Sequence, residues 1–429
     1  MLRLFPVEMR SLVRGTMGRY LLATLMWALA NGLVMSLGMI YITRVHHFST
    51  MAAAELLTAG SLLVLIMGPF FGSLSDRIGP SPVLAVLSFT NAASTLWWAL
   101  SMSHTELICS FVLTAVSGAG LWGQSSVLLA RITHEEDRQR AFGVNFMLVN
   151  LGIGCGGLVS ASVVSVAHPL SFRYLYIGTS VGDIVYGLIL LSLWSHGQRV
   201  PAPDDDHIDR VKKGWGTVLR DRRLVHFLFA STLLAFCGYA SLEVGLSLFV
   251  VNRMHLSVAH MGIAFACNTG TIVLGQIFSL RLIEGRSRTR VIGVVGLLWS
   301  ASWICVGLGA HVGANTAMIL LCLSTSIFAV GETLWSPVAP AMVNQISPDE
   351  LRGRYNAAQG LTWSLSGTLA PLLAGSMLAG SGAGAWPFVV AGGCLVGGLL
   401  GVSLRRSLSA VEDGRVADQA LTSEALPSR

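Results

Sequence analysis

Three carboxylates interrupt long apolar stretches of the sequence: Asp183, Glu243 and Glu332. No Lys or Arg lies well inside these stretches to neutralise them. Burial of a carboxylate penalises its charged form, so such a group favours the protonated form until water reaches it. A carboxylate that alternates between the two forms can take up a proton and release it. The three acids are therefore candidate proton-coupling residues.

Glu332 is the strongest of these candidates, because it lies near the middle of its apolar stretch beside Trp335 and the helix-breaking Pro337. Glu243 lies toward the outer end of its stretch, where a water-filled vestibule accounts for it equally well. Asp183 either couples to protons or packs against a polar partner. For each acid the structural alternative is a protonated group that hydrogen-bonds to a neighbouring helix.

Tryptophan and amide side chains inside the apolar stretches are candidate substrate contacts. Aromatic faces suit flat apolar or cationic molecules, and an acid among aromatic residues favours lipophilic cations over sugars or phosphorylated compounds. A single Trp can also be core packing, and a single amide can be a contact between helices worth about 0.6 kcal/mol. Asn268 and Gln276 are two further amides of this kind. The candidate cavity residues are Trp27, Asn31, Trp122, Gln124, Asn145, Asn150, Trp335, Gln359 and Trp363.

The elements that must position these residues are membrane-spanning helices. The 429 residues are 53% hydrophobic and only 12% charged, whereas a soluble chain carries about a quarter charged residues. This composition excludes a set of water-facing domains, a disordered regulator and a disulfide-stapled secreted module. We expect about twelve spans of about 20 residues. They lie near 18–42, 52–75, 82–102, 107–130, 139–166, 173–195, 224–250, 258–283, 290–310, 315–342, 354–380 and 384–404.

The distribution of basic residues predicts the orientation. Only Arg44, Arg173 and Arg253, of 28 Lys and Arg, fall on one side of the predicted spans. Positive residues stay cytoplasmic, so we expect both termini and the 196–223 connector to be cytoplasmic. The excess of Arg over Lys indicates a bacterial source and hence the inner (plasma) membrane. Since topology explains the net charge of +6, we expect membrane lipid and no nucleic acid as a partner.

The two halves of the chain repeat each other. Residues 132–140 and 346–354 are similar acidic and arginine-rich loops, at the same place in each six-helix half. A shared loop of this kind indicates duplication, and parallel repeats place a transport pathway at their interface. The predicted domains are an N-terminal bundle (1–195), a cytoplasmic linker (196–223), a C-terminal bundle (224–404) and a cytoplasmic tail (405–429).

Glycine and charged residues in the cytoplasmic loops form a candidate gate. In the turn at residues 72–79, Gly72 permits close helix approach and Gly79 permits the turn. Asp76 is an acceptor placed to meet N–H donors at another helix's N-terminus, and Arg77 can pair with a carboxylate or carbonyls. Two later loops add arginines. The gate candidates are Gly72, Asp76, Arg77, Gly79, Arg138, Arg140, Arg352 and Arg354.

The 72–79 turn resembles the G-x-L-x-D-R-x-G signature of the major facilitator superfamily, although Pro80 and Ser81 replace the basic residues that usually follow. Residues 348–354 resemble that family's loop before its eleventh helix. Residues 331–337 resemble the tenth-helix G-E-x-L-x-x-P pattern of proton-coupled multidrug transporters. The chain is identified as a member of this superfamily, and the resemblance implies an all-α membrane fold of about twelve helices in two six-helix bundles.

Two departures from the drug–proton antiporter pattern and one from the superfamily's signature loop are visible. The fourth helix has no arginine at 114–118, the glycine-rich fifth helix at 150–157 lacks the usual proline, and the second-half loop at 279–286 lacks the aspartate. An uptake symporter for a small metabolite and a non-transporting membrane sensor therefore stay open as alternatives.

The expected function is a proton-coupled secondary transporter that exports amphipathic or cationic drug-like molecules by alternating access. We expect a small-molecule substrate, protons as the coupling ion, and a monomer. The sequence has no phosphate-binding loop and no metal-ligand spacing. The G-x-S-x-G at 178–182 lies inside a predicted helix, where a nucleophile elbow cannot form. We therefore expect neither an enzyme nor a cofactor or metal.

Overall fold

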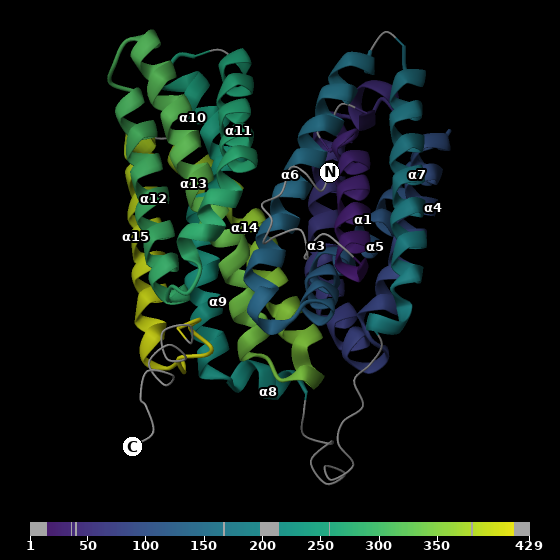
Figure 1. Cartoon of the computed structure of the whole chain (residues 1–429). Helices are drawn as coiled ribbons and strands as arrows, with labels where there is room; N and C mark the ends of the chain where they lie inside the picture. The colour runs from purple at the N-terminus through teal and green to yellow at the C-terminus, as the bar shows by residue number, and fades with distance from the viewer. Residues whose placement is uncertain are drawn as a thin grey trace, which may run out of the picture. The chain divides into compact units, whose positions relative to one another are not determined.

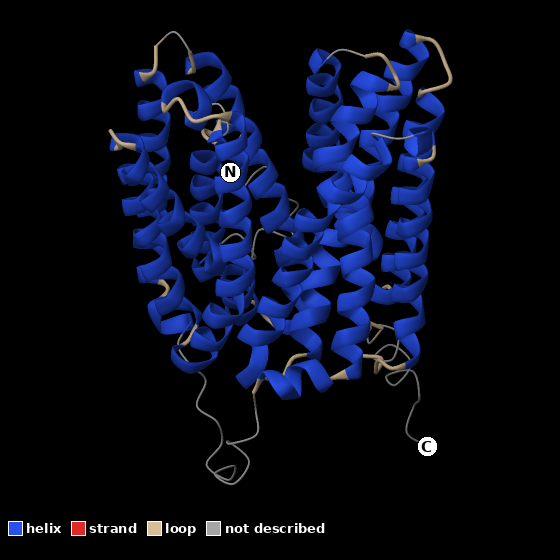
Figure 2. Ribbon diagram, turned by 180° about the vertical axis from the view of Figure 1, so that it is seen from behind, coloured by secondary structure: helices blue, strands red, loops and turns tan. Residues whose placement is uncertain are grey.

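The computed structural model describes residues 15–35, 37–38, 41–165, 168–197, 214–256, 258–378 and 381–415. The regular elements in these ranges are helices, and the ranges contain no strand (Figure 2). Ten of the helices are long and apolar enough to cross a membrane. The predicted all-α membrane fold is thereby confirmed, and the helix count is consistent with about twelve spans.

Contacts divide the chain into two units, which are described separately. Unit 1 comprises Met1–Val211 with Pro348–Gly360, and unit 2 comprises Lys212–Ser347 with Leu361–Arg429. The helix α14 (Arg352–Leu378) therefore begins in unit 1 and continues in unit 2.

Unit 1 is a helical bundle in which α1 packs against α6 and α7, while α4 packs against α5 and α7 (Figure 1). The α1–α6 contact is close because of Gly156, where a Cβ would lie 2.2 Å from the Leu29 carbonyl oxygen. Its elements are α1 (Gly15–Gly32), η3 (Tyr41–Val45), α3 (Thr50–Ile78), α4 (Pro80–Leu100), α5 (His104–Ile132), η4 (Glu135–Asp137), α6 (Arg138–Val163), α7 (Leu170–Ser192), η5 (Trp194–Gly197) and η9 (Asp349–Leu351).

Unit 2 is a second bundle, in which α12 packs against α13 and α15, and α11 packs against α13. The predicted seventh span is divided among α9, a π-helical segment η8 and α10. The elements are α8 (Trp215–Arg220), α9 (Arg222–Leu234), η8 (Ala235–Gly245), α10 (Leu246–Asn252), α11 (Val258–Ile283), α12 (Arg288–Gly309), α13 (Ala314–Ile346), most of α14, η10 (Ser381–Gly384), α15 (Trp386–Ser403) and η11 (Leu404–Arg406).

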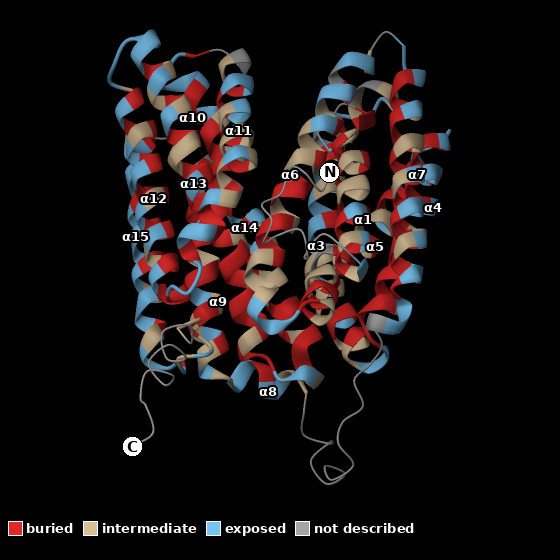
Figure 3. Ribbon diagram, in the orientation of Figure 1, coloured by how far each residue is buried: buried red, intermediate tan, exposed pale blue. Residues whose placement is uncertain are grey.

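The distribution of buried and exposed residues in both units is typical of a membrane-embedded helical bundle. Most helices carry buried residues along one side and exposed residues along the other (Figure 3). Many of the exposed side chains are large and apolar, including Leu158, Leu274 and Phe278. A soluble protein would rarely expose so much apolar surface, whereas lipid is a favourable environment for it.

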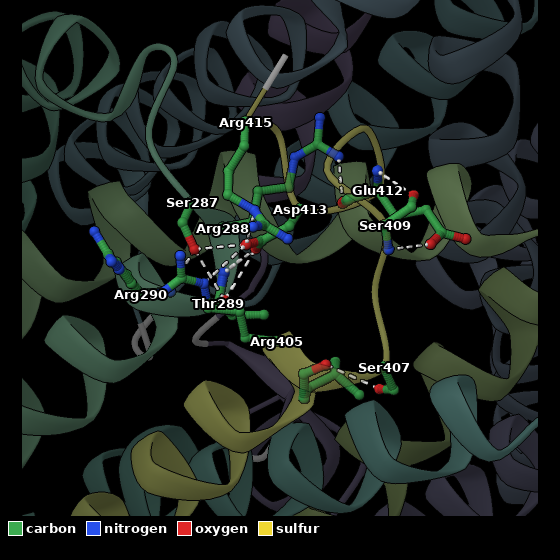
Figure 4. Close-up of polar contacts among 11 residues, drawn as sticks. Ser287, Arg288, Thr289, Arg290, Arg405, Ser407, Ser409, Glu412, Asp413 and Arg415 are labelled. Atoms are coloured by element: carbon green, nitrogen blue, oxygen red, sulfur yellow. Dashed lines mark hydrogen bonds and ion pairs between the residues drawn. The ribbon is translucent and has the colours of Figure 1, made fainter. Parts of the chain in front are cut away.

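The segment after α15 folds back onto the N-terminus of α12 in unit 2 (Figure 4). The fully buried Asp413 carboxylate accepts hydrogen bonds from the Thr289 backbone N–H (2.9 Å), the Thr289 hydroxyl (3.0 Å) and the Ser287 hydroxyl (2.7 Å). It also pairs with Arg415 at 2.9 Å. The first N–H groups of a helix have no partner within the helix, and Asp413 supplies an acceptor for one of them.

Replacement of Asp413 by Ala is expected to destabilise unit 2, by about 1–3 kcal/mol for each buried donor left unsatisfied. The measurement is thermal unfolding of the purified protein in detergent. Ser407→Ala is the matched control, because among the described residues the exposed Ser407 hydroxyl donates only to the nearby Leu404 carbonyl (2.9 Å). Equal melting temperatures for the two variants would contradict the structural role of Asp413.

Candidate functional site

Glu332 lies within α13 and is 6% exposed. The side-chain amide of Asn268, on α11, donates to Glu332 Oε2 at 2.7 Å and to the Thr325 carbonyl at 3.3 Å. The Thr325 hydroxyl in turn donates to the Ala264 carbonyl at 2.9 Å, which ties the two helices together. A neutral amide N–H can donate to either the ionised or the protonated acid, so this contact is compatible with a change of protonation.

Pro337, inside α13, has a structural consequence one turn earlier in the helix. Proline has no backbone N–H, so the carbonyl of residue i−4, here Thr333, loses its helical partner. The buried Gln276 side chain of α11 donates to this carbonyl at 3.1 Å. A second α11 side chain, Ser279, hydrogen-bonds the Thr333 hydroxyl at 2.7 Å. The break that Pro337 creates beside Glu332 is thus compensated by the neighbouring helix.

Replacement of Gln276 by Leu is expected to lower the free energy of unfolding by about 1–3 kcal/mol, because it leaves a buried carbonyl without a partner. The melting temperature in detergent measures the effect. Thr271→Val on the same helix is the control, since the Thr271 hydroxyl donates to the carbonyl of Cys267 in its own helix (2.8 Å) and to no other residue that the structure describes. An unchanged melting temperature for Gln276→Leu would show that the Thr333 carbonyl is satisfied in another way.

Aromatic side chains gather around the Glu332 region of unit 2. Trp335, one turn after Glu332, is buried and stacks on Phe227 of α9 with ring centroids 6.3 Å apart. Trp363 of α14 is 39% exposed and meets Tyr239 edge to face at 4.6 Å. The Tyr239 ring also contacts Trp299 at 5.1 Å. Trp335 therefore packs in the core of the unit, while part of the Trp363 side chain is exposed.

Tyr239 belongs to the π-helical segment η8, between α9 and α10. Such segments are rare in proteins and often occur at functional sites. Glu243 lies in the same segment, although its side chain falls outside the described part of the structure. The backbone thus places this candidate acid in an irregular stretch, which the apolar pattern of the sequence does not indicate.

In unit 1, Asp183 lies in α7 and is fully buried. Asn91 of α4 donates to Asp183 Oδ2 at 2.7 Å, and the Ser88 hydroxyl donates to the Asp183 backbone carbonyl at 2.7 Å. In the opposite direction, the Ser180 hydroxyl of α7 donates to the Ala92 carbonyl of α4 at 2.7 Å. These bonds hold α4 and α7 together and set the position of the acid.

A partly open cavity of about 190 Å³ lies within unit 1, lined mainly by residues of α1, α4, α5 and α7. Trp27 and Asn31 line it, so the structure brings these two candidate residues together; the Asn31 amide also donates to the Trp27 carbonyl at 3.0 Å. The full lining is Trp27, Asn31, Val34, Asn91, Thr95, Trp98, Thr114, Gly118, Leu121, Tyr176 and Thr179.

The other cavity candidates are distributed over three helices. Gln124 is buried on α5, and Asn145 and Asn150 are half-buried on α6. The Asn150 amide donates to the Phe146 carbonyl of its own helix at 3.0 Å. Gln359 is half-buried in the unit 1 part of α14. The side chain of Trp122 lies outside the described part of the structure.

The gate candidates of unit 1 centre on Asp76, at the end of α3. Its carboxylate accepts from the backbone N–H groups of Gly353 (2.6 Å) and Arg354 (3.3 Å) at the start of α14. The Arg354 guanidinium adds an ion pair at 3.0 Å, and the Asp76 side chain is 3% exposed. The acid therefore meets both the free N–H donors and the positive end of the helix dipole.

Two glycines allow this approach. A Cβ on Gly72 would lie 2.6 Å from the Ala357 Cβ, and one on Gly353 would lie 2.4 Å from the Gly72 carbonyl oxygen. Gly79 ends α3 with φ of 93°, a conformation that L-residues rarely adopt. Arg77 is exposed and makes no ion pair with the residues that the structure describes.

The remaining gate arginines lie in the first turn of α6 and at the start of α14. Arg138 donates to the Ala130 carbonyl at 3.1 Å, and Arg140 pairs with Asp137 at 3.3 Å. Arg352 is buried and pairs with Asp349. Burial lowers the pKa of the Arg352 guanidinium, and the Asp349 charge opposes that shift.

Sequence reasoning missed several residues of both sites. Asn91, the partner of Asp183, was detectable as an amide inside the third apolar stretch, but nothing in the sequence pairs it with residue 183. Tyr239 and Trp299 were detectable only as aromatic residues in apolar stretches. Their importance comes from the helix packing that brings them together.

Comparisons with known proteins agree with the fold. The family model described as Major Facilitator Superfamily matches residues 20–294 and 228–424. The uncharacterized MFS-type transporter YdeE of Escherichia coli is 19% identical, over 85% of this chain and 89% of the relative. The Quinolone resistance protein NorA of Staphylococcus aureus is 20% identical, over 75% of this chain and 79% of the relative.

Three further similarities were found, one to a curated relative and two to solved structures. The Na(+), Li(+), K(+)/H(+) antiporter of Planococcus maritimus is 21% identical, over 79% of this chain and 84% of the relative. Among solved structures, a bacterial homologue of the iron transporter ferroportin in an outward-facing state has a TM-score of 0.74 at 14% identity, covering 92% of this chain and all of that one. The human organic anion transporter MFSD10 has a TM-score of 0.71 at 18% identity, with the same coverage. The chain belongs to the Major Facilitator Superfamily and is a multi-pass membrane transporter of small molecules.

Proposed function

We propose that this transporter is a proton-coupled antiporter that exports amphipathic or cationic drug-like molecules by alternating access. The observation that carries the proposal is the geometry at Glu332, a nearly buried acid hydrogen-bonded to the neutral amide of Asn268. Aromatic rings of the same unit lie nearby, including Trp335 and the partly exposed Trp363. The names of the relatives, a quinolone resistance protein and a cation/H(+) antiporter, support this substrate class and this coupling.

In this proposal the proton and the cationic substrate compete for the Glu332 carboxylate, and this competition couples their movements. The ionised Glu332 attracts a cationic substrate, and the aromatic faces bind its apolar part. Proton uptake neutralises the acid, so the attraction is lost and the cation is released. The exchange drives export when the proton gradient is directed inward and the site opens to each side of the membrane in turn. Glu243 then either lies in a water-filled vestibule or serves as a second coupling residue.

Asp76 and its neighbours form the gate in this proposal. The Asp76 carboxylate holds the first turn of α14, so any movement of α14 relative to α3 must break the ion pair and two hydrogen bonds. The proposal includes a monomer in the inner membrane of a bacterium, in contact with lipid, with both termini and these gate loops on the cytoplasmic side. The positive-inside distribution of Lys and Arg supports that orientation.

The test uses purified protein in liposomes with an imposed pH gradient and a panel of fluorescent lipophilic cations. The expected result is dye flux in one direction with substrate-dependent proton movement in the other. Proton entry together with a sugar, an amino acid or an organic anion, and no dye response, would replace antiport by uptake symport. Ligand binding without any flux would indicate a membrane sensor.

A further inference from the structure

Asp183 is the most deeply buried acid that the described part of the structure places within a span, at 0% exposure in α7. Its Oδ2 accepts from Asn91 at 2.7 Å, while Oδ1 makes no hydrogen bond to the residues that the structure describes. Moving an ionised carboxylate out of water costs several kcal/mol unless a charge or hydrogen bonds compensate. Neutral amides without a positive charge are a weak compensation, so the neutral acid is favoured unless water reaches it.

Among the residues that the structure describes, no Lys, Arg or His pairs with Asp183. The helix α4 contributes no titratable side chain, and α7 itself contributes Tyr176 and Tyr186. Its Arg173 and Tyr174 lie about 15 and about 14 Å earlier along the helix at 1.5 Å per residue. The helix α1 contributes Tyr20, which donates to the Ser125 carbonyl at 3.1 Å, and Arg19, which donates to Ser192 at 3.5 Å. Ser192 lies about 13 Å further along α7 at 1.5 Å per residue.

The histidine of the short helix η5, His196, follows α7 beyond that same end. Tyrosine titrates near pH 10 in water. Among the described residues of this region, Asp183 is therefore the carboxylic acid to which a proton can be delivered.

The unit 1 cavity supplies a route for water. Both amides next to Asp183, those of Asn91 and Asn31, line it, as does Thr179, one turn before Asp183 on α7. Thr95 and Thr114 add further polar groups. A buried water needs two to four polar partners, and a volume of about 190 Å³ accommodates several waters.

We propose that Asp183 is a proton-binding site of unit 1, loaded through the polar cavity beside Asn91 and Asn31, and separate from the site at Glu332 in unit 2. A hydronium in the cavity transfers its proton to the free Oδ1 of the ionised acid, leaving water and a neutral carboxyl group. The reverse step releases the proton. Asn91 donates to Oδ2 in both states, so the helices need not separate when the charge changes.

Each unit then holds one acid on one helix bound by an asparagine amide from a neighbouring helix, at 2.7 Å in both cases. The two pairs come from non-equivalent helices of the repeat, α4 with α7 and α11 with α13. Proton binding by Asp183 does not depend on the proposed function, whereas the use of that proton in transport rests on it. If both hold, the transporter carries a second proton for each substrate.

The test is pH-difference infrared spectroscopy of the purified protein in detergent, because a protonated carboxyl group has its own C=O stretching band. Acidification of the wild type is expected to produce such a band, which Asp183→Asn removes and Asp183→Glu displaces in frequency. The band is expected to persist in Glu332→Gln. Glu55→Gln is the matched control, since Glu55 is an exposed acid of α3 in the same unit.

A wild-type spectrum unchanged by Asp183→Asn would overturn the proposal, because Asp183 would then keep one protonation state throughout. If Asp183→Asn fails to fold, the frequency in Asp183→Glu decides: a displaced band supports the proposal and an undisplaced band overturns it. A titrating Asp183 band in a protein without substrate-driven proton movement would leave the Asp183 site standing and reject the antiporter. In liposomes, Asp183→Asn is expected to move one proton fewer per substrate.

Discussion

Glu332→Gln is expected to reduce substrate-driven proton movement in liposomes to the level of protein-free vesicles. Glutamine has nearly the same shape and can still accept a hydrogen bond from Asn268 through its carbonyl oxygen, so the fold around α11 and α13 is preserved. It cannot bind or release a proton. The variant is therefore expected to bind hydrophobic dyes, with weaker affinity for cations, and to lose the acceleration of dye export by a pH gradient.

The measurement compares wild type, Glu332→Gln and Glu55→Gln at several external pH values. Glu55 is exposed in α3, and its replacement is expected to leave the pH dependence of transport as in the wild type. Proton-coupled transport at the wild-type rate in Glu332→Gln would rule out this acid as the coupling group. It would transfer that role to Asp183 or Glu243.

Asp76→Ala is expected to lower the free energy of unfolding by about 3–5 kcal/mol, because it removes one partner of a buried ion pair. The change leaves the Arg354 guanidinium without its carboxylate and leaves the Gly353 N–H, now bonded at 2.6 Å, without an acceptor. Asp76→Asn is expected to lose less stability, since the carbonyl oxygen of the asparagine side chain still accepts from the Gly353 N–H. Transport by both variants is expected to fall with the loss of the gate contact.

Thermal unfolding in detergent measures this difference, with Arg77→Ala as the control from the same turn. The exposed position of Arg77 predicts a change within about 0.5 kcal/mol. A melting temperature for Asp76→Ala equal to that of Arg77→Ala would show that the contact between α3 and α14 contributes nothing to the stability of unit 1.

Much of the Asp76 contact follows from sequence. The acid lies in a turn between two apolar stretches, its loop carries the superfamily signature, and an acceptor in that place has helix N-termini as natural partners. The sequence does not say which N-terminus. Residues 76 and 353 are separated by most of the chain, and only packing reveals that Gly72 and Gly353 let α3 and α14 approach so closely.

The sequence by itself determined that the chain lies in a lipid bilayer, that its fold is all-α, which family it belongs to and where its acids lie along the chain. Hydropathy, helix length and loop signatures are local properties of the chain, so sequence alone reveals them. The tertiary structure decided which residue hydrogen-bonds to each buried polar group. Asn91 with Asp183, Asn268 with Glu332, and Gln276 with the carbonyl that Pro337 leaves free are each set by the rotation and depth of two packed helices. A buried polar group must find a partner wherever packing places one, and that choice depends on residues far apart in the chain.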